Sequence, residues 1–303
     1  MDASFLRGSY PPLVTPFRDG AVDYDTVTAL VEHQIDNGSQ GVVVCGTTGE
    51  PTSLTRAERE AVLATAVRAA RGRLPVVAAT GSQALDETIA LTAAAERDGA
   101  DAVLIVTPYF SRPPQRGLVE YFIAVAVRTR LPVLIYHIPG RAAVQLEAAT
   151  VGRIIDAAPH VVGIKHAAND LSLASELLAR FGPEFRLFVG LEELSFPMLA
   201  LGATGVMNAV GNVAPRQVAA LCAAVAGGDL AAARQLHFAL LELNQAVFFD
   251  TNPIPIKYMM KRLGLLPANE HRLPMVPATA ELERRLDAVL ERAGFDVTVG
   301  ARR

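Results

Sequence analysis

The sequence predicts an α/β protein that folds as a (β/α)8 barrel, a TIM barrel, with a helical extension at its C-terminal end. Three observations support this prediction: short β-branched runs alternate with longer helical patterns, the pair recurs eight times, and the strand signal ends at Gly227-Gly228. A barrel of this kind occupies about 250 residues, which fits a chain of 303. We therefore expect a barrel domain in residues 1–228 and a three-helix extension packed on it in residues 229–303.

The expected strands are eight short apolar runs. They occupy 12–15, 41–45, 75–79, 102–106, 133–136, 161–165, 186–189 and 205–208. The helical patterns between them begin near Asp25, Thr55, Ala84, Gln115, Leu146, Leu171, Glu193 and Ala214. Eight closely spaced units favour closure into a barrel over an open sheet.

Local signals support these boundaries. Thr55 and Glu58 fit a capping box, in which each side chain satisfies a free amide at the start of a helix. Asp98-Gly99 then ends the third helical pattern. In the extension, three further helices are expected over 230–249, 256–263 and 279–293. Since only a Gly-Gly pair separates the two parts, we expect one cooperative unit without a hinge.

The composition describes a globular protein and argues against several kinds of partner. Hydrophobic residues make up 51% of the chain and charged residues 19%, enough apolar surface for a large core. A net charge of -3 gives no basic field for nucleic acid or for anionic membranes. The apolar runs are too short to span a bilayer, and no secretory signal is recognisable at the N-terminus. We expect a cytoplasmic protein whose two cysteines, Cys45 and Cys222, are small core residues.

Functional residues of such a barrel gather where its strands end. Lys165 is the most informative of them, because the chain has only three lysines and this one ends the apolar run 161–164. A lysine there should point into the barrel mouth, where burial penalises the ammonium and frees the amine to attack a carbonyl as a Schiff-base nucleophile. A structural ion pair is the alternative for the same position.

Tyr136 ends the preceding strand, so its phenol is expected beside the Lys165 amine. Imine formation needs a proton for the departing hydroxyl, and a phenol polarised by a hydroxyl partner can deliver one. The competing interpretation is an ordinary core tyrosine with a satisfied hydroxyl.

Two further motifs could bind carboxylates. The turn Gly46-Thr47-Thr48-Gly49 follows a strand and precedes a capped helix, so its amides and hydroxyls could cradle an anion, although a plain tight turn explains the glycines equally well. Arg141 follows Pro139-Gly140 and could clamp a carboxylate, or it could be a surface arginine. His137 and His166 lack a third ligand at metal spacing, so we predict no metal site.

Together these segments resemble the dihydrodipicolinate synthase / N-acetylneuraminate lyase family over nearly the whole chain. The matching stretches keep the family's order and spacing. They are 46–50, 107–109, Tyr136 with Pro139 and Arg141, 163–165, Gly190, 252–257 and 273–275.

The resemblance implies a class I lyase or synthase that activates pyruvate without a metal or organic cofactor. Lys165 would form the imine, Tyr136 would relay protons with Thr47 as its partner, and Thr48 would bind the keto-acid carboxylate. Gly49, Gly190, Tyr109 and Phe110 complete the implied substrate site. Arg141 favours a 4-hydroxy-tetrahydrodipicolinate synthase, in which this arginine receives the carboxylate of aspartate semialdehyde. The family's barrels usually form dimers or tetramers, with an aromatic residue of one subunit reaching the neighbouring site.

Several residues depart from the family pattern on the side of the second substrate. Phe110 stands where the synthases carry the middle tyrosine of a Thr-Tyr-Tyr relay, and a phenylalanine relays no proton. The other departures are His137 for asparagine, Ala142 for threonine, His166 for glutamate and Leu191 for aspartate. The alternative activity is therefore a catabolic aldolase or dehydratase of a 2-keto-3-deoxy or 4-hydroxy-2-oxo acid. A family member that binds a keto acid without catalysis is a third hypothesis, against which the intact Lys165 and Tyr136 argue.

Overall fold

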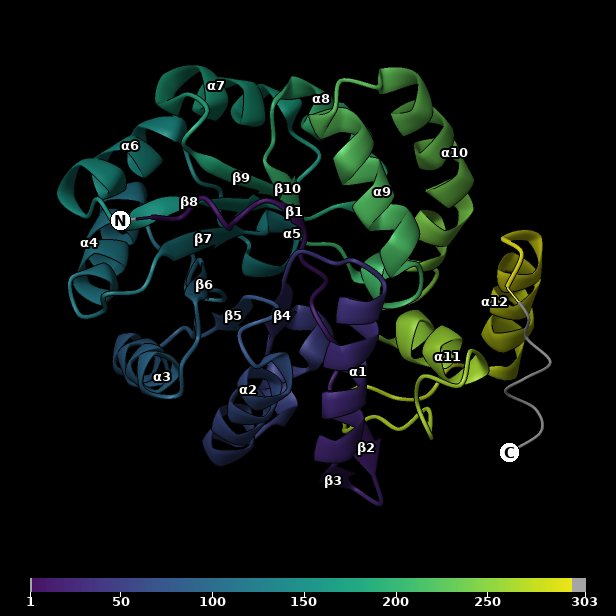
Figure 1. Ribbon diagram of the computed structural model, residues 1–303. Coiled ribbons are helices and arrows are strands. Elements are labelled where there is room, and N and C mark those ends of the chain that lie inside the picture. The colour runs from purple at the N-terminus through teal and green to yellow at the C-terminus, as the bar shows by residue number, and fades with distance from the viewer. Residues whose placement is uncertain (1, 296–303) are drawn as a thin grey trace.

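The computed structural model describes residues 2–295 and confirms the predicted fold class (Figure 1). Eight strands form one parallel sheet in the order β1-β10-β9-β8-β7-β6-β5-β4. Their bounds are β1 Gly8–Ser9, β4 Val42–Val44, β5 Val76–Ala79, β6 Ala102–Val106, β7 Val133–His137, β8 Val161–His166, β9 Arg186–Val189 and β10 Gly205–Val206. A separate antiparallel hairpin joins β2, Phe17–Arg18, to β3, Ala21–Val22.

The predicted first strand was placed too late in the chain. The structure has β1 at Gly8–Ser9, and the expected 12–15 segment contributes only an isolated bridge between Pro12 and Val43. Pro11 and Pro12 lack the amide hydrogens that a regular ladder needs, so they break the strand. The bridge nevertheless joins the β1 end of the sheet to β4, because the Leu13 amide donates to the Val43 carbonyl at 2.8 Å. The ring of strands is closed at this point.

Helices cover the outside of the ring (Figure 1). They are α1 Tyr24–Asp36, α2 Arg56–Ala70, α3 Leu85–Arg97, α4 Gln115–Ala126, α6 Ala148–Ala157, α7 Leu171–Phe181, α8 Ser195–Leu201 and α9 Pro215–Ala226. The short α5, Pro139–Ala142, follows β7 and contributes residues to the pocket at the ends of the strands. Each of the eight expected helices begins within two residues of its predicted start. The predicted capping box of α2 is also confirmed, since Thr55 and Glu58 exchange both bonds.

Three helices follow the barrel, as predicted. They are α10 Leu230–Ala246, α11 Ile254–Arg262 and α12 Ala280–Arg292. In Figure 1, α10 lies beside α9, while α11 and α12 lie at the same side of the barrel. The division into domains at residue 228 stays a prediction.

Alternate strand residues face two different cores. Val43, Val77, Leu104, Leu134 and Tyr136 belong to the apolar cluster that fills the barrel. Their neighbours along each strand pack between the sheet and the helices. Because side chains alternate with period two, this pattern decides which residues at a strand end face the barrel mouth.

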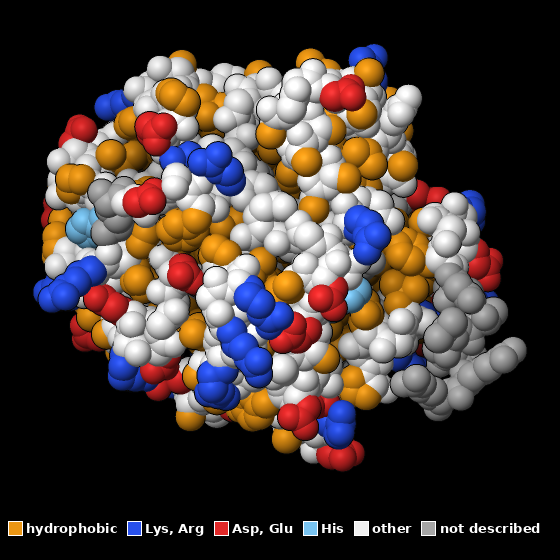
Figure 2. Space-filling view, in the orientation of Figure 1, with side chains coloured by type: hydrophobic (Ala, Val, Ile, Leu, Met, Phe, Trp, Pro, Cys, Tyr) orange, Lys and Arg blue, Asp and Glu red, His pale blue; other side chains and the backbone are white. Residues whose placement is uncertain are grey.

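Charged side chains of both signs are interspersed over the face of the molecule shown in Figure 2. Within residues 2–295, no helix is long and apolar enough to cross a membrane.

Candidate active site

Lys165 and Tyr136 are brought together as the strand positions predict. They are paired in the register of β7 and β8, so both side chains point into the barrel. The Lys165 Nζ atom lies 4.2 Å from the centroid of the Tyr136 ring. Both side chains are buried, with 4% and 5% of their surface exposed. A compact amine is thus held against a phenol in a largely desolvated place.

Gly190, at the end of the next strand, leaves room for this lysine. A Cβ atom at position 190 would lie 3.0 Å from Lys165 Cε and 2.6 Å from Ala167 Cβ. Any larger residue would therefore push the amine out of its place. Glycine here serves close packing against the lysine.

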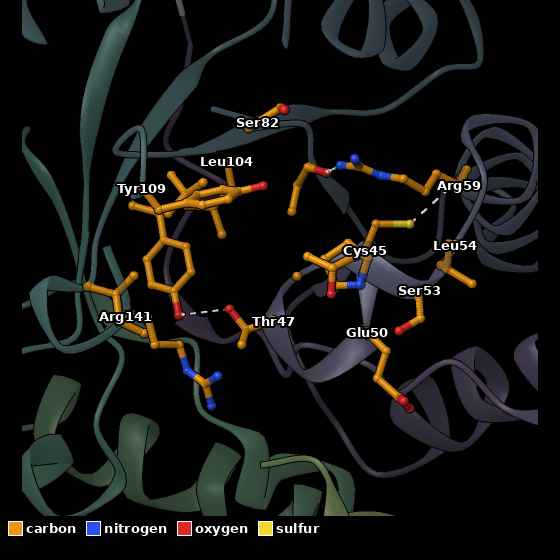
Figure 3. A pocket seen from close by; sticks show the side chains of 18 of the residues that line it. Cys45, Thr47, Glu50, Ser53, Leu54, Arg59, Ser82, Leu104, Tyr109 and Arg141 are labelled. Carbon is orange, nitrogen blue, oxygen red and sulfur yellow. Dashed lines mark hydrogen bonds between the residues drawn. The ribbon is translucent and has the colours of Figure 1, made fainter. Parts of the chain in front are cut away.

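A pocket of about 420 Å³ opens beside Tyr136 at the C-terminal ends of the strands. Thr47, Tyr109, Tyr136 and Arg141 line it, whereas Lys165, which lies against the Tyr136 ring, is not part of the pocket lining. The Thr47 hydroxyl lies 3.4 Å from the Tyr136 hydroxyl, the contact drawn as a dashed line in Figure 3. The expected hydroxyl partner of the tyrosine is therefore present.

The turn after β4 forms a short 3₁₀ helix, Thr47–Gly49. The Gly49 amide donates to the Gly46 carbonyl at 2.8 Å, so this amide is already used within the turn. Thr48 is 3% exposed, and its hydroxyl oxygen accepts a hydrogen bond from the Asn252 side chain at 3.0 Å. Since that bond uses the oxygen as acceptor, the Thr48 hydroxyl hydrogen is left for another acceptor, such as a carboxylate.

Arg141 lies in α5, on the same side of the pocket as Thr47 (Figure 3). Its side chain is exposed, and its Nη2 atom donates to the Asn252 carbonyl at 3.4 Å. The arginine thus lines the pocket while keeping most of its donors free.

Phe110 stands apart from the other predicted site residues. It is 91% exposed and is not among the residues that line the pocket, whereas the neighbouring Tyr109 is. Its backbone has a φ of 71°, a conformation that is uncommon for a bulky residue. Within one chain, position 110 takes no part in the pocket.

His137 and His166 form a buried pair directly behind the site. They follow Tyr136 and Lys165 in the strands and therefore face outward, stacked with their centroids 5.2 Å apart and their Nδ1 atoms 3.1 Å apart. His166 Nε2 lies 2.9 Å from the Asp170 carbonyl, which can only accept, so this nitrogen carries a hydrogen. A neutral His166 then accepts at Nδ1, and His137 donates to it. His137 Nε2 then accepts from the Leu146 amide, 3.3 Å away, and the Gln145 side-chain amide at 3.0 Å must turn its NH₂ group toward the same nitrogen.

This arrangement requires both rings to be neutral, which makes stability depend on pH. Burial, and then the neighbouring His166, lower the pKa of His137 to about 4, against about 6.5 in an unfolded chain. Between these values the unfolded state binds more protons, so the free energy of unfolding should fall as the pH drops from 6.5 to 4, by roughly 3 kcal/mol for this residue. We expect denaturant unfolding of His137→Asn to show a flatter pH dependence in that window. Equal slopes for both proteins would contradict the assignment.

Two residues near the site were not predicted from the sequence as functional residues. Asn252 reaches Thr48 from the extension, and only the family resemblance of 252–257 pointed to that segment. Glu192 is fully buried, with its Oε1 atom accepting the Ala209 amide at 2.6 Å. Burial raises the pKa of this carboxyl to about 7, and the charge of Lys165 acts in the opposite direction. A strand end followed by an acidic pair gives no signal of such burial.

Comparison with known proteins finds relatives that match nearly the whole chain. Residues 5–293 match the sequence profile of the Dihydrodipicolinate synthetase family. A 4-hydroxy-tetrahydrodipicolinate synthase from Thermus thermophilus is 46% identical over 292 residues, which cover 96% of this chain and 97% of that protein. The crystal structure of dihydrodipicolinate synthase from Aquifex aeolicus superposes with a TM-score of 0.93 at 40% identity, covering 94% of this chain and 97% of that one.

A third relative has been solved with a bound ligand. The chloride-inhibited dihydrodipicolinate synthase from Acinetobacter baumannii, solved in complex with pyruvate, is 34% identical and superposes with a TM-score of 0.93. The alignment covers 96% of this chain and all of that one.

Proposed function

We propose that this chain, which belongs to the dihydrodipicolinate synthetase family, is a 4-hydroxy-tetrahydrodipicolinate synthase that condenses pyruvate with aspartate semialdehyde through an imine on Lys165. The observation that carries the proposal is the buried Lys165 amine, 4.2 Å from the Tyr136 ring at the ends of adjacent strands. Curated relatives with this activity share up to 46% of their residues with it.

The chemistry follows from these positions. The Lys165 amine attacks the C2 carbonyl of pyruvate, and the carbinolamine loses its hydroxyl as water, with a proton supplied by Tyr136. Loss of a methyl proton from the imine gives an enamine, whose carbon attacks the aldehyde of the second substrate. The resulting alkoxide takes up a proton. The amino group of the bound semialdehyde then attacks the imine carbon, and the bond from that carbon to Lys165 breaks as the amine of Lys165 takes up a proton. Thr47 supports the tyrosine in both proton transfers.

The two carboxylates are assigned to different parts of the site. Thr48, whose hydroxyl hydrogen remains free, is proposed to bind the carboxylate of pyruvate close to Lys165. Arg141, at the outer part, is proposed to bind the carboxylate of the second substrate. Gly49 and Gly190 shape the site by allowing close packing.

Phe110 favours a second candidate function. This is a catabolic aldolase or dehydratase of a 2-keto-3-deoxy or 4-hydroxy-2-oxo acid. Phe110 supplies no hydroxyl, and it lies outside the pocket of its own chain. The deciding experiment measures pyruvate consumption with aspartate semialdehyde beside pyruvate release from a panel of these keto acids, in the natural protein and in Phe110→Tyr. A kcat/KM of about 10⁴ M⁻¹s⁻¹ or more with the semialdehyde alone supports the synthase. A keto acid that is preferred tenfold would replace it with the aldolase.

Arg141→Ala should separate the two half-reactions. We expect borohydride to trap pyruvate on Lys165 as before, because the arginine serves only the second substrate. Turnover should fall at least tenfold, since losing hydrogen bonds between charged groups costs roughly 1.5 to 3 kcal/mol. Arg112→Ala is a suitable control, because this exposed arginine is not among the pocket-lining residues. Unchanged turnover in Arg141→Ala would leave that residue as a surface arginine.

We further propose that the protein works as a homodimer or homotetramer in the cytoplasm, as the family resemblance implies. One related solved structure is described as a monomeric dihydrodipicolinate synthase variant, so assembly varies among relatives. Sedimentation of the purified chain measures it directly.

A further inference from the structure

A second buried lysine lies near the site, in the C-terminal extension. The Lys257 side chain is completely buried, and its Nζ atom lies 2.8 Å from Glu50 Oε1. Glu50 is equally inaccessible, and it follows Thr47, Thr48 and Gly49 directly in the chain. A buried ion pair of this kind costs desolvation and adds little net stability compared with apolar packing. Stability alone therefore does not explain why this pair lies beside the 46–50 turn.

The surroundings fix this pair and keep its carboxylate charged. Lys257 Nζ lies 4.4 Å from the centroid of the Phe17 ring, and the second oxygen of Glu50 lies 3.5 Å from His271 Nδ1. Burial raises the pKa of Glu50, but His271 and Lys257 more than offset that effect and bring it below its ordinary value. Glu50 is thus held as a carboxylate whose position is determined from two sides.

Glu50 also determines the course of the turn. Its backbone has a φ of 52°, in the left-handed region, and its amide donates to the Thr47 carbonyl at 3.2 Å. In Figure 3 its side chain is directed away from that of Thr47. Anchoring this side chain from behind therefore fixes the backbone that presents the two threonines.

A second anchor reaches the turn from the same short segment. Asn252, five residues before Lys257, donates from Nδ2 to Thr48 Oγ1 at 3.0 Å. Its carbonyl accepts from Arg141 at 3.4 Å. Residues 252–257 thus contact the proposed pyruvate side through two side chains and the second-substrate side through one carbonyl.

We propose that Asn252 and Lys257 are positioning residues, which hold the 46–50 turn so that Thr48 presents its hydroxyl hydrogen to the keto-acid carboxylate. The inference rests on the proposed function, in which that turn binds pyruvate. It assigns the C-terminal extension a part in substrate affinity, beyond covering the barrel.

Asn252→Asp tests the first anchor with little change in volume. An aspartate carboxylate has no hydrogen to donate, so it would accept the Thr48 hydroxyl hydrogen and withdraw it from the substrate. We expect KM for pyruvate to rise about tenfold or more, the effect of losing one hydrogen bond to a charged group, with kcat changed less. An unchanged KM for pyruvate overturns this part of the proposal.

The ion pair is tested by Lys257→Met alone and together with Glu50→Gln. The single variant leaves a buried charge without its partner and should lower the melting temperature, whereas the double variant removes both charges and should regain much of that loss. We expect KM for pyruvate to stay raised by about tenfold in the double variant, because the turn has lost its anchor. A KM that returns to the natural value together with stability would show a purely structural pair. Lys261→Met, an exposed lysine of the same helix, is the matched control and should leave both measurements unchanged.

Borohydride trapping distinguishes failure of this inference from failure of the proposed function. At saturating pyruvate, the natural protein and all these variants should accumulate the adduct on Lys165. If the natural protein forms none, the proposed function is wrong. If it forms the adduct and the variants need no more pyruvate for half-maximal trapping than the natural protein, only the positioning role is overturned.

Discussion

Lys165→Ala is expected to abolish turnover, by about 10⁴-fold or more, and to abolish the pyruvate adduct entirely. The reason is covalent: without the amine, neither imine nor enamine can form, and removing the nucleophile of a covalent enzyme typically costs losses of this size. Pyruvate and borohydride should convert the natural protein irreversibly into a secondary amine that carries a three-carbon acid. Peptide mass spectrometry should locate that mass on Lys165.

The other two lysines provide the control for this experiment. Lys257 is completely buried in its ion pair with Glu50, and Lys261 lies exposed on the surface of α11. Lys257 is held in that ion pair and Lys261 faces solvent, so neither should be modified in proportion to pyruvate. An adduct on Lys257 or Lys261, or one that persists in Lys165→Ala, would contradict the assignment of the nucleophile.

Much of this fold could be predicted because the strands are buried on both faces. Runs such as 102–106 and 133–136 are therefore almost continuously apolar and end at a polar or aromatic residue, which marks the barrel mouth. Tyr136 and Lys165 follow two neighbouring runs of this kind, and parallel pairing places them side by side. The first strand was misplaced because Gly8 and Ser9 have no β-branched signal, whereas the later proline-rich segment resembles a strand without being able to pair as one.

The remainder of the site depends on contacts that no local pattern reveals. Asn252 and Lys257 are about two hundred positions away from Thr48 and Glu50, and only the folded chain brings them together. Similarly, the sequence places His137 and His166 near the mouth, but their outward orientation and mutual hydrogen bond follow from the strand register. The exposure of Phe110 was also beyond prediction, because it depends on the course of a loop.

Tyr136→Phe is expected to slow turnover by about 10²- to 10⁴-fold, the usual effect of losing a positioned acid-base group. The variant keeps the aromatic ring against Lys165 and the barrel packing, so its stability should change little. Loss of water from the carbinolamine should then become slow, and single-turnover borohydride trapping should show a reduced rate of imine formation with an undiminished final amount on Lys165.

Two companion variants assign the proton path around Tyr136. Thr47→Val removes the hydroxyl that lies 3.4 Å from the tyrosine and should cost about tenfold, because the phenol itself remains. Tyr109→Phe removes the other tyrosine hydroxyl of the pocket lining and should cost less than Tyr136→Phe, since Tyr109 is not paired with Lys165 in the strand register. If Tyr109→Phe lowers turnover more than Tyr136→Phe does, the proton path runs through Tyr109. Tyr136 then only packs against Lys165.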